Sequence, residues 1–217
     1  MTSPARPWRR TDGFIARPWR RAGGGVVARL VWLHAVGRRV PAALAVILAC
    51  AAGLRVALLW QWKDYGALQL PLLFETGCAA AIAVTSASPF GEPERATGSR
   101  LSCLRLGTAL ALTGVAAGAL LAAGGTLRGV RDLAGLVGVG LLCAVLLGGA
   151  PAWAGPLGYA MAGVYALYTQ WHGPALTTPW IWPGRPAGDA GGAVCAALVF
   201  AAGTALFTLR GARDVST

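Results

Sequence analysis

Six long apolar segments follow one another through most of this chain of 217 residues. They cover approximately residues 40–60, 66–86, 106–125, 133–149, 152–171 and 191–209. A helix needs roughly 20 mainly apolar residues to cross the hydrocarbon core of a bilayer, and each segment reaches or approaches that length. Only 12% of the residues are charged, too few to cover a water-facing surface. We therefore expect an all-α, polytopic membrane protein with six transmembrane helices.

The basic residues predict which side of the membrane each connection faces. Nine arginines precede the first segment, three lie between the second and third, and two follow the sixth. The other connections hold only Lys63, Arg128, Arg131 and Arg185. Cytoplasmic flanks carry the excess of Lys and Arg, so we expect both termini in the cytoplasm and the protein in a bacterial plasma membrane. The fifth segment is either a full span or a re-entrant helix.

The hexapeptide ARPWRR occurs at residues 5–10 and again at 16–21. Its prolines interrupt a helix, and tryptophan among arginines suits the headgroup region of a membrane. We interpret residues 1–22 as a disordered basic arm in the cytoplasm. A net charge of +11 also suits nucleic acid, but the apolar composition favours lipid, and we expect no nucleic-acid partner. The residues of the predicted contact with the inner leaflet are Trp8, Arg9, Arg10, Trp19, Arg20 and Arg21.

The rest of the chain divides around the apolar segments. Residues 23–39 contain an apolar stretch that is interrupted by Arg29 and His34 and is too short to cross a bilayer. Such a stretch predicts an interfacial helix along the inner leaflet. Residues 40–210 form the predicted transmembrane domain, and residues 211–217 form a cytoplasmic tail.

Two ionisable residues, Arg55 and Glu75, fall inside apolar segments. At about 1.5 Å per residue, Arg55 lies roughly 9 Å and Glu75 roughly 13 Å from the outer ends of their segments. A charge inside the bilayer costs roughly 2.5 to 3.5 kcal/mol on insertion scales, so such residues pair or face a wet cavity. We predict an intramembrane pair across the first hairpin, with either a structural role or a role in transport.

No set of catalytic residues is evident. The only histidines, His34 and His172, fall on opposite sides of the membrane in this topology, which disfavours haem and metal sites. The single lysine follows a tryptophan, so the chain has no phosphate-binding G-x-x-x-x-G-K-[ST] loop. The five scattered cysteines have no C-x-x-C spacing and are typical of packing residues. We expect no enzyme activity, cofactor or metal.

The longest cytoplasmic connection, SASPFGEPERATGSR at residues 86–100, differs from the tight turns elsewhere. It combines an aromatic residue with charges of both signs, which suits docking to another protein, although an ordinary solvated loop is the alternative. The residues of this predicted contact are Ser88, Pro89, Phe90, Gly91, Glu92, Glu94 and Arg95.

The connection before the sixth segment, residues 171–192, is rich in proline and carries Trp171, Trp180 and Trp182. Tryptophan at this density is typical of the interface between membrane and water. We expect an outer interfacial belt, in a connection long enough to dip back toward the membrane.

This layout resembles the permease subunit of ABC-2-type ABC transporters, and it is also similar to small permease-like proteins of actinobacteria. In that family the loop between spans two and three forms a coupling helix on a separate ATPase subunit, and the connection before the last span is often re-entrant. The resemblance covers residues 23–213 and places SPFGEPER, residues 88–95, at the coupling position. It implies an exporter that works with an ATP-binding cassette ATPase subunit and a second permease, identical or related.

Two other classes of function compete with transport. A non-transporting scaffold, immunity or accessory subunit of a membrane complex would use Arg55 and Glu75 for packing alone. A membrane enzyme is disfavoured because no cluster of His, Asp or Glu collects at one membrane depth. A nucleotide-binding partner would separate a transporter from a scaffold.

Overall fold

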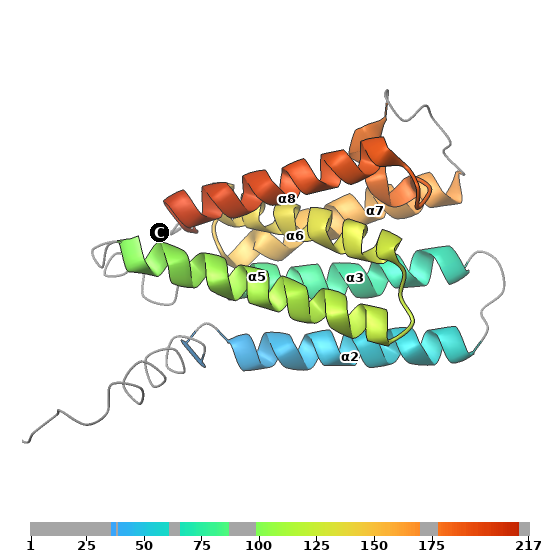
Figure 1. Cartoon of the computed structure of the whole chain (residues 1–217), viewed down its shortest axis with the longest axis horizontal. Helices are drawn as coiled ribbons and strands as arrows, with labels where there is room; N and C mark the ends of the chain where they lie inside the picture. The colour runs from blue at the N-terminus through green and yellow to red at the C-terminus, as the bar shows by residue number, and fades with distance from the viewer. Residues whose placement is uncertain (1–35, 38, 61–65, 87–98, 170–177, 213–217) are drawn as a thin grey trace, which may run out of the picture. The chain divides into compact units, whose positions relative to one another are not determined.

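In the computed structural model, the described residues form a bundle of six long helices that run alongside one another (Figure 1). The structure describes residues 36–37, 39–60, 66–86, 99–169 and 178–212. The long helices are α2 (Val40–Leu59), α3 (Gly66–Thr85), α5 (Ser99–Ala122), α6 (Leu127–Leu146), α7 (Ala154–Tyr168) and α8 (Ala190–Arg210), and two 3-10 helices are η1 (Ala150–Trp153) and η2 (Pro179–Gly184). No β-strand occurs in these ranges, and the predicted all-α class is confirmed.

Four of these helices have the length and composition of a membrane span. They are Val40–Leu59, Cys103–Ala122 within α5, Leu127–Leu146 and Ala190–Arg210. The apolar stretch of α3 is shorter, at Gln69–Thr85, and α7 has only 15 residues. Large apolar side chains lie exposed on the bundle, among them Leu48, Met161 and Leu198, each more than 60% exposed. A surface of this kind suits lipid rather than water, so the fold is compatible with a membrane protein.

Two helices begin earlier than hydropathy predicts. α5 begins at Ser99 instead of near residue 106, and α6 begins at Leu127 instead of near residue 133. The first turns of both helices are polar, so the apolar segments in the sequence begin after them. Arg128, Arg131 and Asp132 were expected in an outer connection, and they lie instead in the first two turns of α6.

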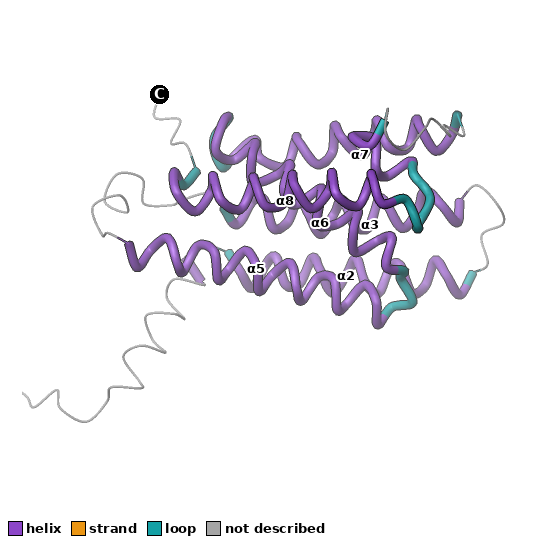
Figure 2. The backbone as a smooth tube through the Cα atoms, turned by 45° about the horizontal axis from the view of Figure 1, so that its top comes forward, coloured by secondary structure: helices purple, strands orange, loops and turns teal. Residues whose placement is uncertain are grey.

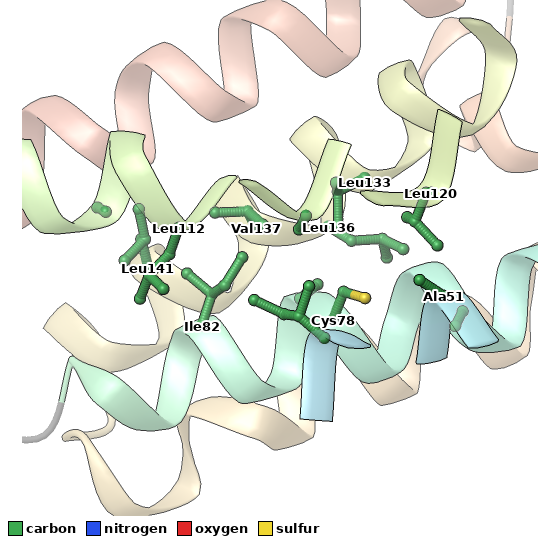
Figure 3. Packing of buried hydrophobic residues seen from close by; sticks show 14 of the residues in the cluster. Ala51, Cys78, Ile82, Leu112, Leu120, Leu133, Leu136, Val137 and Leu141 are labelled. Atoms are coloured by element: carbon green, nitrogen blue, oxygen red, sulfur yellow. The ribbon is translucent and has the colours of Figure 1, made fainter. Parts of the chain in front are cut away.

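Helix α6 is the centre of the bundle and packs against α3, α5, α7 and α8. Figure 3 shows its leucines beside Ile82 of α3 and Leu112 of α5, within one apolar cluster. Lipid is as apolar as leucine, so close packing rather than exclusion of water holds such a cluster together in a membrane. The apolar side chains of α6 with no more than 1% exposure are Leu133, Leu136, Val137, Leu141 and Ala144.

Two glycines bring α6 and α8 into contact along their main chains, and Figure 2 shows the two helices side by side. A Cβ atom at Gly138 would lie 2.6 Å from the carbonyl oxygen of Val199, and one at Gly203 would lie 2.5 Å from that of Gly138. Small residues allow this close approach between membrane helices. The close packing of small residues in this bundle thus occurs between α6 and α8.

The ends of the helices alternate through the bundle. α2, α5 and α7 end where α3, α6 and α8 begin, and we call this the η2 end of the bundle (Figure 1). α8 begins there with a side-chain cap, since the carboxylate of Asp189 accepts a hydrogen bond from the amide of Gly192 at 2.8 Å. At the opposite end α2 begins and α8 ends, and Gly211 follows α8 with a φ of 72°.

Candidate functional site

A cavity of about 320 Å³ lies at the η2 end of the bundle. Parts of α2, α3 and α6 form its wall together with the turn between α5 and α6 and the connection from η2 to α8. A mostly apolar wall with a few polar groups is typical of small-molecule sites. The charged residues of the wall are Glu75, Arg128 and Asp132, and its larger apolar residues are Leu54, Leu58, Pro71, Leu72 and Pro183.

Arg131 of α6 holds the connection between η2 and α8 in place. Its guanidinium donates hydrogen bonds to the carbonyl oxygens of Trp182 at 2.8 Å, Arg185 at 3.2 Å and Pro186 at 2.9 Å. The connection is rich in proline, and within it the carbonyl oxygens of Trp182 and Pro186 each also accept one main-chain hydrogen bond, from Arg185 and Asp189. A planar guanidinium with five N–H donors is suited to collect several such oxygens at once.

Asp132 lies between the two arginines of the first turns of α6. Its side chain is 4% exposed, and its oxygens lie 3.0 Å from Nε of Arg131 and 3.5 Å from Nε of Arg128. Arg128 also donates a hydrogen bond to the carbonyl oxygen of Pro183. We call Arg128, Arg131 and Asp132 the arginine clamp, because together they bind η2 to α6.

A second ion pair fixes the start of α8. Nε of Arg185 lies 3.0 Å from Oδ2 of Asp189, and Arg185 also bonds to Thr178 on the other side of η2. The hydrogen bonds from Arg185 hold the pKa of Asp189 below its ordinary value, with the amide of Gly192 acting in the same direction. The pair therefore closes the η2 connection onto the first turn of α8.

Trp182 of η2 points into the bundle and is only 1% exposed. Its ring stacks on Tyr159 of α7, with centroids 4.4 Å apart and planes 23° apart. A Cβ atom at Gly135 would lie 2.5 Å from the indole ring, so this glycine makes room for it. The prediction of an interfacial belt is wrong for Trp182, which is a core residue, whereas Trp180 is 54% exposed.

Glu75 of α3 lies in the cavity wall and is only 5% exposed. A Cβ atom at Gly129 would overlap its Oε1 atom, so the carboxylate lies directly against the first turns of α6. The nearest charges come from the arginine clamp.

Arg55 is exposed on α2, and its guanidinium lies beside Gly124 in the turn between α5 and α6. The ion pairs of the described residues do not join it to Glu75. Arg55 and Glu75 lie on faces of α2 and α3 that do not bring their side chains together. The structure thus gives Glu75 different neighbours from the predicted one.

The other predicted contact residues lie outside the described residues. This holds for the basic arm and for nearly all of the interfacial helix, residues 23–39, as well as for Trp171. It also holds for the predicted ATPase contact, which comprises Ser88, Pro89, Phe90, Gly91, Glu92, Glu94 and Arg95. The predicted lipid contacts also lie outside the described residues, and they are Trp8, Arg9, Arg10, Trp19, Arg20 and Arg21.

The described residues offer no ready metal site. Within them no three side chains of His, Cys, Asp or Glu gather closely enough to hold an ion. The five cysteines are free, and Cys78 is fully buried in the apolar cluster. That position agrees with the interpretation of a small packing residue.

The arginine clamp was not recognised in the sequence, although a signal for it exists. Arg128 and Asp132 are four residues apart, the spacing of an ion pair on one helix face. Reading LRGVRDLAG as the first turns of a helix would have predicted this pair. The assignment of residues 127–132 to a connection concealed it.

Comparisons with known protein families, with curated proteins and with solved structures gave no match. The class of the protein therefore follows from its fold. The chain is an all-helical protein with four helices suited to a bilayer, and its cavity and arginine clamp lie at one end of the bundle.

Proposed function

We propose that this chain is the permease subunit of an exporter, driven by a separate ATP-binding cassette ATPase subunit and paired with a second permease. Six crossings of a bacterial plasma membrane, with both termini in the cytoplasm, belong to this proposal. α3 has 20 residues, and η1 with α7 covers residues 150–168. Each of these segments is roughly 30 Å long, the thickness of the hydrocarbon core.

The charges at the η2 end support an outward orientation for it. Arg128, Arg131 and Arg185 are engaged by carboxylates and main-chain oxygens of the chain itself. At the opposite end lie Arg39 before the first turn of α2, Arg105 near the start of α5 and Arg210 in the last turn of α8. In the sequence, further arginines precede α2 and α5 and follow α8. A bias of this kind orients membrane proteins with that end toward the cytoplasm.

The observation that carries the proposal is the inward position of η2. A connection that merely links two helices has no need of a buried tryptophan and a clamp of charged residues, whereas here both hold η2 among the helix ends. A re-entrant connection at this place is what the resemblance to ABC-2-type permeases implies. In an exporter, η2 would border the outer mouth of a path beside α3 and α6.

Energy would reach such a permease from its neighbour. The sequence has no nucleotide-binding loop, so ATP binding and hydrolysis take place in the partner. The predicted contact, residues 88–95, would follow the closure of the ATPase subunits. The permease pair would then change between two arrangements with different contacts at that loop.

Purification of the tagged full chain from its native cells in mild detergent tests the proposal. We expect it to bring a nucleotide-binding subunit whose ATP hydrolysis is inhibited by vanadate. Replacing Phe90 and Glu92 by alanine should release this subunit. A matched control replaces Asp214 and Val215, an acidic and an apolar residue of the tail, and should retain it. A chain that purifies without any nucleotide-binding subunit contradicts the proposal and favours the non-transporting scaffold.

A further inference from the structure

The carboxylate of Glu75 lies in the wall of the cavity, and the described residues give it no hydrogen bond and no ion pair. Glu75 is 5% exposed. Asp132 in the same wall is held by both arginines of the clamp. A bare carboxylate in a mainly apolar wall is costly, and membrane proteins use such groups to bind ions or substrates.

The neighbouring cations of the described chain are directed elsewhere. Arg131 bonds to Asp132 and to three carbonyl oxygens of the η2 connection, and it does not line the cavity. Arg128 is shared between Asp132 and the carbonyl oxygen of Pro183. Both arginines lie near Glu75, but the hydrogen bonds and ion pairs of the described residues direct their donors to Asp132 and to carbonyl oxygens.

The local structure keeps this carboxylate in the cavity. A side chain at Gly129 of α6 would overlap Oε1 of Glu75, so a glycine at this position leaves space for the carboxylate. Leu54 and Leu58 of α2 and Leu72 of α3 supply apolar wall around the same space. Beside the Arg128–Asp132 ion pair in the same wall, Glu75 thus stands as an acidic group among side chains that suit a hydrocarbon body.

We propose that this cavity binds an organic cation that has a protonated amine and a compact apolar body, with Glu75 as the counter-ion of the amine. A hard metal cation requires about six oxygen ligands, which a single free carboxylate does not supply. A volume of about 320 Å³ lies at the lower end of the range for small-molecule sites. The proposal concerns this chain alone and holds whether the chain exports a substrate or serves as a scaffold.

Thermal unfolding of the full chain in phosphatidylcholine nanodiscs tests this site. The probes are 1-adamantylamine and 1-adamantanol, which share a compact apolar body and differ in the charge of the polar group. The amine should raise the Tm by roughly 3 to 6 °C at ten times its Kd. The alcohol should raise it much less. Equal shifts with both probes, or no shift with the amine up to millimolar concentration, would overturn the proposal.

Two variants locate the binding. Glu75→Gln keeps the shape of the side chain and removes its charge, and it should abolish the shift with the amine. Should that variant fail to fold, Gly129→Ala displaces the carboxylate and should weaken the shift at least tenfold in concentration. Asp189→Asn is the matched control, because it removes a carboxylate at the same end of the bundle that does not line the cavity. An unchanged shift in the folded variants at positions 75 or 129 also contradicts the proposal.

This test is independent of the exporter proposal. It needs neither an ATPase subunit nor a second permease. Binding of the amine without an ATPase partner would leave the cavity proposal standing while the exporter proposal fails. An ATPase partner without binding of the amine would leave the exporter proposal standing while the cavity proposal fails.

Discussion

Replacing Arg131 by alanine should release η2 from the bundle. The side chain of Arg131 is 8% exposed and bonds to Asp132 and to three carbonyl oxygens. Without it, Asp132 keeps only Arg128, at 3.5 Å. Breaking a buried ion pair from one side costs about 3 to 5 kcal/mol. For a chain of this length that free energy corresponds to a fall in Tm of roughly 6 to 20 °C.

Tryptophan fluorescence during heating of the full chain in detergent measures this loss, since Trp182 leaves its buried position when η2 is released. Arg131→Lys keeps the charge but not the planar fork of donors, so its Tm should lie between those of the unmodified chain and of Arg131→Ala. The matched control is Arg210→Ala, an exposed arginine in the last turn of α8. Its Tm should change by less than about 2 °C. An Arg131→Ala variant within 2 °C of this control would refute the role of the clamp.

Three further results are expected. Because Arg185 lowers the pKa of Asp189, the ionised carboxylate stabilises the fold above pH of about 4, and this contribution is lost as the pH falls through the lowered pKa. Asp189→Asn should therefore lower the Tm at pH 7, and the difference from the unmodified chain should shrink below pH of about 4; a constant difference would speak against it. Gly138→Ala should cost about 1 to 3 kcal/mol because its methyl group meets the main chain of α8. Gly158→Ala, a helical glycine with open space around it, should leave the Tm unchanged or raise it, and equal effects at the two positions would contradict the packing. A green fluorescent protein fused to the C-terminus should fluoresce and an alkaline phosphatase fused there should be inactive, whereas active phosphatase would reverse the proposed orientation.

Hydropathy predicts the helices of this chain well because long apolar segments have few other solutions in a bilayer. The segment 40–60 and the helix Val40–Leu59 agree almost to the residue. Hydropathy fails at the start of α6, where Arg128 and Asp132 form their own ion pair within the helix. The sequence does not distinguish a charged residue that is paired within the fold from one that is exposed to water.

The candidate site was predictable in part. Glu75 stands out because it is the acidic residue of a long apolar segment. The residues around Glu75 depend on how α3 is rotated about its axis relative to α6. The depth of a residue in the membrane does not determine this rotation. A prediction from depth alone therefore placed Arg55 beside Glu75. The burial of Trp182 likewise depends on the space that Gly135 leaves, far away in the sequence. Tertiary packing here overrides the common preference of tryptophan for the interface.

The touching main chains at Gly138 and Gly203 restrict how this molecule is able to change shape. No side chains separate α6 from α8 at these positions, so the two helices behave as one rigid unit. Sliding one along the other would bring carbonyl oxygens into steric conflict with the opposite main chain. Any widening at the η2 end would then require other helices to move relative to α6 and α8. Glu75 lies on α3 and the arginine clamp on α6, so a movement of α3 relative to α6 would alter the distance between these charges.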